Sequence, residues 1–148
     1  MNLLPLDARL AYRGSKRSTK GCGPVIKTEV SGLPRPRRAF SQAVLIDGFL
    51  YTAGIGPFDP ETRQICGLTI EEQTHQTMIN LSQVLEHAGL TFDHAIKVTV
   101  HLQNLARDFD GFDQTYRSFF SSQPYPVRTT VGSHLRAILV EIDLVAHI

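Results

Sequence analysis

The stretch RAILVEIDLVAHI (residues 136–148) decides the fold, because it is the most strand-like part of the chain. Its even positions are apolar: Ile138, Val140, Ile142, Leu144 and Ala146. Since side chains alternate between the two faces of a strand, Glu141 and Asp143 are predicted to share the opposite face. Exposure to plain solvent would explain two carboxylates, but the flanking Leu139 and Val145 favour burial of that face. Partly buried carboxylates need hydrogen-bonding or charged partners.

Arg128 is a candidate for that partner. It lies in the segment PVRTTV (126–131), whose alternation places Arg128 and Thr130 on one face. We expect this segment to pair with residues 136–146 as a hairpin, which would bring Arg128 near Glu141. A guanidinium and a carboxylate on one half-enclosed face can bind a substrate carboxylate and position a water molecule. A structural salt bridge between the two side chains is the alternative, and spacing alone favours it.

An Asp-Gly pair marks a second hairpin. Asp47 and Gly48 separate the apolar runs 42–46 and 49–53, and both residues tolerate the positive φ of a two-residue turn. A further strand is predicted upstream, at residues 25–30. The first half of the chain is therefore expected to supply three strands.

Two helices are predicted after this hairpin, with a strand between them. Thr69 and Glu72 have the spacing of a capping box at the start of the first helix, residues 70–88. The strand at 94–104 alternates apolar and polar residues, and the second helix, about 108–121, carries an aromatic stripe that we assign to the core. The order β-β-β-α-β-α-β-β favours an α+β fold with both helices on one face of a sheet. Self-association is the natural way to cover the other face.

Composition indicates one globular domain. The chain has 148 residues, is 42% hydrophobic and 20% charged, and contains no apolar run long enough to span a membrane. Its net charge is +1, but residues 1–40 hold nine Lys or Arg against two Asp or Glu. We predict a basic, flexible arm at residues 1–22 and a single domain over 23–148. The arm has three interpretations: a solvated terminus, a mitochondrial transit peptide, or a contact for RNA.

Cysteine and histidine usage predicts no metal site. Cys22 and Cys66 lie far apart, and the six histidines show no tight ligand spacing. A Gly-rich phosphate loop after a strand and a serine-elbow pattern are both absent from the sequence. We therefore expect a cytoplasmic protein that needs no metal or cofactor.

The segments PYPVRTTV (124–131) and LVEIDLVA (139–146) resemble the C-terminal signature of the YjgF/RidA family of reactive intermediate deaminases. Other segments agree with this family in order and spacing. They are FSQAVLIDGFLYTAGIGPFDPETRQI (40–65), TIEEQTHQTMINLSQVLEHAGL (69–90), IKVTVHLQNL (96–105) and FDQTYRSFF (112–120). The resemblance runs from about residue 39 to the C-terminus.

This resemblance implies a chorismate-mutase-like α+β fold that assembles as a homotrimer around a central β-barrel, with a ligand cleft at each subunit interface. It implies hydrolysis of enamines and imines such as 2-iminobutanoate and 2-iminopropanoate to a 2-oxo acid and ammonia, without a cofactor. By resemblance, Arg128 would bind the substrate carboxylate and Glu141 would orient the attacking water. The backbone around Gly54 and Thr130 would add hydrogen bonds.

Several of the positions expected to bind substrate depart from the family pattern. Phe40 stands where a Tyr is usual, Ala53 replaces a Ser, and Thr130 replaces a Cys. On the second helix, Asp113 replaces an Asn, and Tyr116 completes the expected site. The more apolar pocket implies an altered substrate preference. The alternatives are an enzyme for a bulkier pathway intermediate, or an RNA-directed or regulatory protein that binds through its arm.

Overall fold

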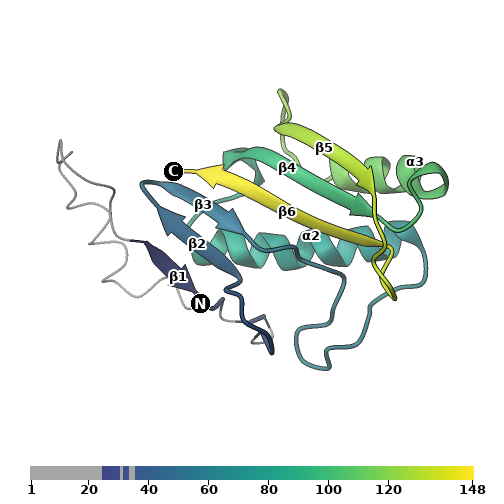
Figure 1. Cartoon of the computed structure of the whole chain (residues 1–148). Helices are drawn as coiled ribbons and strands as arrows, with labels where there is room; N and C mark the ends of the chain where they lie inside the picture. Colours follow the sequence, from purple (N-terminus) through teal and green to yellow (C-terminus); the bar gives the residue numbers. More distant parts are fainter. Residues whose placement is uncertain (1–24, 31, 34–35) are drawn as a thin grey trace.

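The computed structural model describes residues 25–30, 32–33 and 36–148, so the predicted arm at 1–22 lies outside the described residues. These residues form one six-stranded mixed sheet with two helices packed on one face (Figure 1). The strands are β1 (Ile26–Thr28), β2 (Ala43–Ile46), β3 (Phe49–Thr52), β4 (Ala95–Leu102), β5 (Val127–Gly132) and β6 (Val140–His147). The helices are α2 (Ile70–His87) and α3 (Leu105–Arg117), with a short 3₁₀ turn (Phe92–His94) before β4. The predicted α+β class and element order are confirmed.

The hairpin between β2 and β3 forms at the predicted place. Ile46 and Phe49 are paired residues on either side of a two-residue turn. Asp47 and Gly48 have φ angles of 47° and 84°, the left-handed conformation that this turn requires at both positions. The turn thereby fixes the antiparallel register of the two strands.

The start of α2 also follows its sequence signal. The Thr69 side chain accepts a hydrogen bond from the Glu72 amide at 3.3 Å, and the Glu72 carboxylate accepts one from the Thr69 amide at 3.1 Å. This reciprocal capping box satisfies amides that have no partner within the helix. Gly89, with φ of 76°, follows the C-terminal end.

The second half of the chain differs in detail from the expectation. Helix α3 begins earlier, because the Asn104 side chain caps it by accepting from the Arg107 amide at 3.1 Å, and it ends at Arg117. A register shift near the start of β4 leaves Ile96 44% exposed, which interrupts the predicted alternation. Phe109, assigned to the core with the aromatic stripe, is 38% exposed.

The predicted hairpin between the last two strands is wrong. The sheet order is β1-β2-β3-β6-β4-β5, so β4 lies between β5 and β6. Strand β5 pairs with β4 in parallel, because α3 forms the crossover that a parallel pair needs. Strand β6 then enters the middle of the sheet, antiparallel to both β3 and β4 (Figure 1). It is also shorter than predicted, since it begins at Val140.

The core lies between the sheet and the helices. Even-numbered residues of β6 are buried there, and Glu141, Asp143 and Val145 alternate with them on the other face, as predicted. That other face, toward the viewer in Figure 1, carries no helix or strand of the described chain. It exposes Tyr51 by 46% and Val127 by 68%. Within the described residues, no helix has both the length and the apolar character to cross a membrane.

Candidate functional site

Glu141 lies in one part of the candidate site. It projects from β6 on the open face of the sheet and is half-buried. The segment that contains Gly54 and Ile55 lies beside Glu141. It is fixed to β6 by two backbone hydrogen bonds between Ile55 and Ile142, at 2.9 and 3.0 Å. This pairing brings Gly54 so close that a Cβ atom on it would lie 2.6 Å from a carboxylate oxygen of Glu141. Only glycine therefore leaves room for the carboxylate in its observed place.

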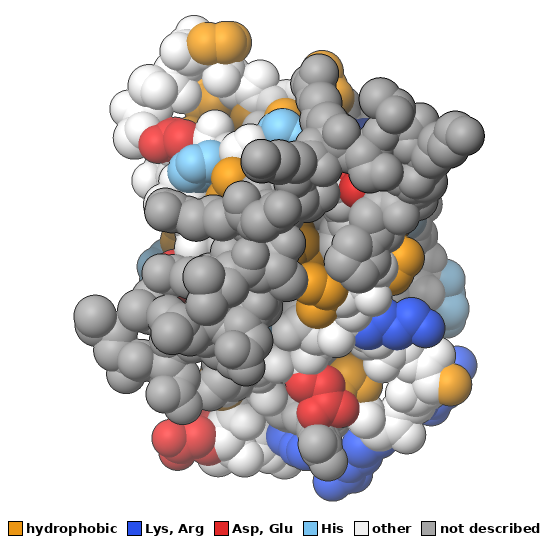
Figure 2. Space-filling model, turned by 90° about the vertical axis from the view of Figure 1, so that its left-hand side faces the viewer, with side chains coloured by type: hydrophobic (Ala, Val, Ile, Leu, Met, Phe, Trp, Pro, Cys, Tyr) orange, Lys and Arg blue, Asp and Glu red, His pale blue; other side chains and the backbone are white. Residues whose placement is uncertain are grey.

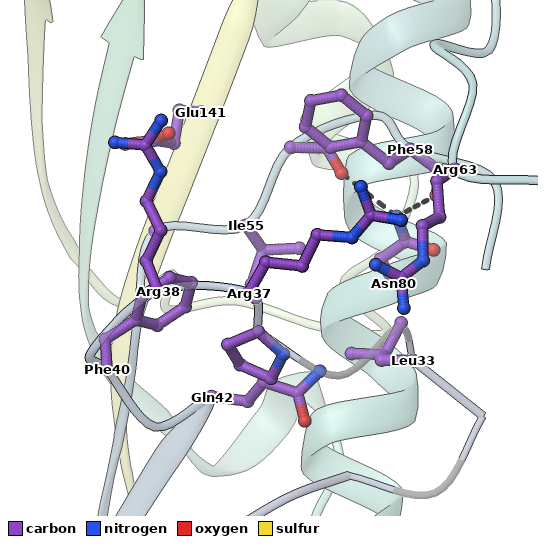
Figure 3. A pocket seen from close by; sticks show the side chains of 13 residues that line it. Leu33, Arg37, Arg38, Phe40, Gln42, Ile55, Phe58, Arg63, Asn80 and Glu141 are labelled. Carbon is purple, nitrogen blue, oxygen red and sulfur yellow. Dashed lines mark hydrogen bonds between the residues drawn. The ribbon is translucent and has the colours of Figure 1, made fainter.

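A pocket of about 480 Å³ opens beside this carboxylate (Figure 3). Phe40 and Gly54, both predicted to bind substrate, line it together with Glu141. Phe40 is 52% exposed and offers a ring without a hydroxyl group. The other residues that line the pocket are Leu33, Pro36, Arg37, Arg38, Gln42, Ile55, Gly56, Phe58, Arg63 and Asn80.

Arg128 lies in a second hollow, formed by β5 and α3. Its guanidinium donates a hydrogen bond from Nη1 to Asp113 Oδ1 at 2.7 Å. It also lies over aromatic rings of α3, 5.2 Å from the centroid of Phe112 and 4.9 Å from that of Tyr116. Such stacking stabilises a cation that has lost part of its water shell. The residues that line this hollow are Asp113, Tyr116, Arg117, Tyr125, Pro126 and Arg128.

The electrostatics of this hollow are set by Asp113. Burial alone raises the pKa of its carboxyl group, but hydrogen bonds from Arg117 and Arg128 outweigh that effect and hold the pKa below its ordinary value. Two cations thus share one anion. Burial also raises the pKa of Tyr116 to about 12, which the nearby Arg128 partly opposes. The Tyr116 hydroxyl is buried and has no hydrogen-bond partner among the described residues.

The two parts of the site do not meet within one chain. Arg128 is in register with the buried Val98, so it points to the helix side of the sheet, whereas Glu141 is in register with His101 on the open face. The predicted shared face is therefore wrong, because it assumed that β5 and β6 were neighbours. The alternative of a salt bridge between Arg128 and Glu141 is wrong as well. Arg128 is paired with Asp113 instead.

Two predicted residues stand apart from both hollows. Ala53 donates its amide to the Gln42 carbonyl at 2.8 Å and is not among the residues lining the first pocket. Thr130 is half-buried on β5, on the same side as Arg128, but does not line its hollow. Neither position contradicts a role in an assembled cleft, and both stay predictions.

Sequence reasoning missed several residues of the two hollows. Arg117 lies four residues after Asp113 on α3, a spacing at which opposite charges pair, so this signal was present. Arg37 and Arg38 are adjacent in the sequence, but Arg63 comes from the loop after β3, and the sequence carries no signal that joins it to them. Among the described residues, no group of three or more His, Cys, Asp or Glu is placed to hold a metal ion.

Comparison with known proteins identifies the chain. Residues 31–148 match the model of the family described as Endoribonuclease L-PSP. The chain belongs to this family. This match covers both hollows and every predicted site residue. The YjgF/RidA proteins that the sequence resembles belong to this family.

Relatives within the Endoribonuclease L-PSP family agree in length and fold. A RutC family protein of Saccharolobus solfataricus is 39% identical over 76% of this chain and 90% of its own length. The human protein named 2-iminobutanoate/2-iminopropanoate deaminase is 31% identical over 72% of this chain and 78% of its own. A solved structure of a conserved Rid family protein from Yersinia pestis superposes with a TM-score of 0.78, at 30% identity, over 84% of this chain and 100% of its own.

Proposed function

We propose that this protein hydrolyses small 2-imino acids to 2-oxo acids and ammonia, in clefts completed between copies of the chain in a homotrimer. The observation that carries the proposal is that Arg128 and Glu141 are both present, each in its own open hollow, yet on opposite faces of one sheet. The human and rat relatives named as 2-iminobutanoate/2-iminopropanoate deaminases support the reaction class.

Two features of the sheet support self-association. Strand β5 is at the edge, so one side of its backbone has no strand partner among the described residues. The open face presents apolar side chains of three strands, which favours burial against another protein surface. A copy that packed the β5 edge against a neighbour's open face would bring its Arg128 toward the neighbour's Glu141.

Hydrolysis of an imine requires few catalytic groups from the protein. The imine carbon is already electrophilic, so orientation of the substrate and of one water molecule supplies much of the acceleration. Arg128 binds the substrate carboxylate, and Glu141 accepts a proton from the water as its oxygen bonds to the imine carbon. The nitrogen takes up a proton, the carbon–nitrogen bond then breaks, and ammonia leaves as the hydroxyl proton is lost. The products are one 2-oxo acid and one ammonia for each imine and water consumed.

Asp113 changes how this site would recognise a carboxylate. Its Oδ1 already occupies Nη1 of Arg128, so a substrate must use the remaining guanidinium donors or displace Asp113. Arg117 binds the same carboxylate, which leaves the three side chains with a net positive charge. The hollow therefore still attracts an anion, but less strongly than an unpaired arginine would.

An imine generated in place tests the proposal. An amino acid oxidase supplies 2-iminobutanoate while semicarbazide competes for it, and loss of semicarbazone reports hydrolysis. We expect the wild type to lower semicarbazone formation and Arg128→Ala to lose the effect. Arg107→Ala is the matched control, because Arg107 pairs with Asp108 on α3 as Arg128 pairs with Asp113, but outside both hollows. If wild type and Arg128→Ala behave alike, the assignment fails.

A further inference from the structure

The pocket beside Glu141 holds three arginines that the hydrolysis of a simple 2-imino acid does not use. Arg37 and Arg38 follow the described segment 32–33, and Arg63 comes from the loop after β3. Glu141 is the single acidic residue among the lining residues of this pocket. Among the described residues, none of the three arginines forms an ion pair with a carboxylate. The pocket is therefore strongly positive.

The arginines lie at two ends of the pocket. Figure 3 shows the Arg38 side chain at the same end as Glu141. The guanidinium groups of Arg37 and Arg63 lie at the other end, on the side of Asn80 (Figure 3). The lining also includes the apolar side chains of Leu33, Phe40, Ile55 and Phe58, and Figure 3 shows Ile55 between the two ends. The space-filling view shows one face of the molecule, on which most of the visible Lys and Arg side chains lie in the lower half (Figure 2).

The far end is built on a fixed frame. The Asn80 side chain is buried and donates to the carbonyl oxygens of Gly56 at 3.0 Å and Phe58 at 2.8 Å. The loop that follows closes on itself, since Asp59 and Gln64 are joined through their backbones at 2.8 Å. These bonds hold the wall and the base of the loop in place. They also use up both amide protons of Asn80, so a ligand at this end must be bound by other donors, such as the arginines.

Arg63 adds an independent observation. Its φ is 63°, the left-handed conformation that disfavours a residue with a Cβ atom and suits glycine. The nearby Asp59 carboxylate accepts hydrogen bonds from the amides of Glu61 and Thr62 within the turn, and it forms no ion pair with Arg63. An arginine at a strained position, unpaired and beside a pocket, is typical of a binding residue.

We propose that Arg37 and Arg63 form a second oxyanion subsite, so that the preferred substrates are 2-imino acids with an acidic group at the far end of the molecule. The inference rests on the proposed function for the near end, where Glu141 and a neighbour's Arg128 hold the imino acid. The apolar lining accommodates the carbon chain, and the two guanidinium groups bind the distal carboxylate or phosphate.

Binding of stable 2-oxo acids tests the subsite without any turnover. 2-Oxoglutarate and 2-oxopentanoate have the same chain length and differ in the terminal group, so calorimetry on the pair isolates the second anion. We expect 2-oxoglutarate to bind the wild type at least about tenfold more tightly, as charge-assisted hydrogen bonds require. Phosphorylated hydroxypyruvate, assayed beside it, distinguishes a phosphate from a carboxylate as the preferred distal group.

The variant Arg63→Gly removes the guanidinium and relieves the backbone, so its melting temperature should not fall. We expect it to lose most of the preference for 2-oxoglutarate and to bind 2-oxopentanoate as the wild type does. Arg136→Gly is a matched control, because Arg136 is exposed, has a φ of 62° and lies outside the pocket. Equal affinities for the two acids in the wild type, or an equal loss in both variants, would overturn the subsite.

The outcome for the subsite is separable from that for hydrolysis. Tight binding of 2-oxoglutarate or phosphorylated hydroxypyruvate that depends on Arg63, without hydrolysis of the corresponding imine, supports the subsite and refutes the reaction. Hydrolysis of short and acidic imines with equal kcat/KM, together with equal binding of the two 2-oxo acids, refutes the subsite and supports the reaction.

Discussion

Mixing two inactive variants should restore activity, because the site is proposed to be shared between copies. Within one chain, Arg128 is opposite Val98 on β4 and Glu141 is opposite His101 on the same strand. Their Cα atoms are thus two strand spacings and three residues apart, roughly 14 Å, with side chains on opposite faces. A single chain therefore cannot bring the two groups to one substrate.

The expected recovery follows from the interface. Arg128→Ala keeps Glu141, and Glu141→Ala keeps Arg128, so a complete site forms where a copy of the second variant donates its Arg128 to a copy of the first. In a closed trimer that contains both variants, one of the three interfaces has this composition. We expect the mixed trimers, once purified free of trimers of a single variant, to show about a third of wild-type activity.

The assay uses the two variants with different affinity tags, co-expressed and purified through both tags. Hydrolysis of 2-iminobutanoate is then measured by competition with semicarbazide. Co-expression of Arg128→Ala with the double variant Arg128→Ala/Glu141→Ala is the control, since no interface in that mixture has Arg128. Mixed oligomers as inactive as their parents would refute the shared site. A fully active Glu141→Ala parent would refute the role of Glu141.

Two further substitutions address the neighbours of these groups. Gly54→Ala should lower kcat/KM for hydrolysis of 2-iminobutanoate about a hundredfold, because its Cβ atom must displace the Glu141 carboxylate. Gly132→Ala is the control and should change kcat/KM little, because its added Cβ atom would meet its nearest neighbour at an ordinary 3.5 Å. Asp113→Asn should tighten binding of 2-oxobutanoate by up to about tenfold in calorimetry, because a neutral amide oxygen holds Nη1 of Arg128 less strongly than a carboxylate does. Unchanged affinity would count against competition by Asp113. At pH values above 3.8, the ordinary pKa of an Asp carboxyl group, the same variant should have a melting temperature a few degrees below that of the wild type. The difference should shrink as the pH falls below that value, because a group with a depressed pKa stabilises the folded state only while it is ionised.

Local signals in the sequence predicted local structure well. The Asp47-Gly48 turn and the Thr69 capping box each depend on a few consecutive residues, and both appear where expected. The alternation of β6 also predicted which of its side chains are buried. These features need no knowledge of what lies next to the segment in space, so a single sequence carries them.

The patterns in the sequence did not predict the order of the strands or the composition of the pocket. Alternation in β5 and β6 says which residues share a face of one strand, but not that β4 separates the two strands. The partner of Arg128 was misassigned for that reason. The arginine pocket likewise depends on how the loop after β3 folds back toward residues 36–40, which is a tertiary contact without a periodic pattern.

The central place of β6 has a consequence for how the protein is made. A ribosome releases residues 140–147 after every other strand, yet the sheet needs them between β3 and β4. Until then, β1-β2-β3 and β4-β5 are two fragments, each with a free edge where β6 will later pair. The nascent chain therefore holds two half-sheets with unpaired edges, and chaperones that shield such edges should matter most until residues 140–147 have been made.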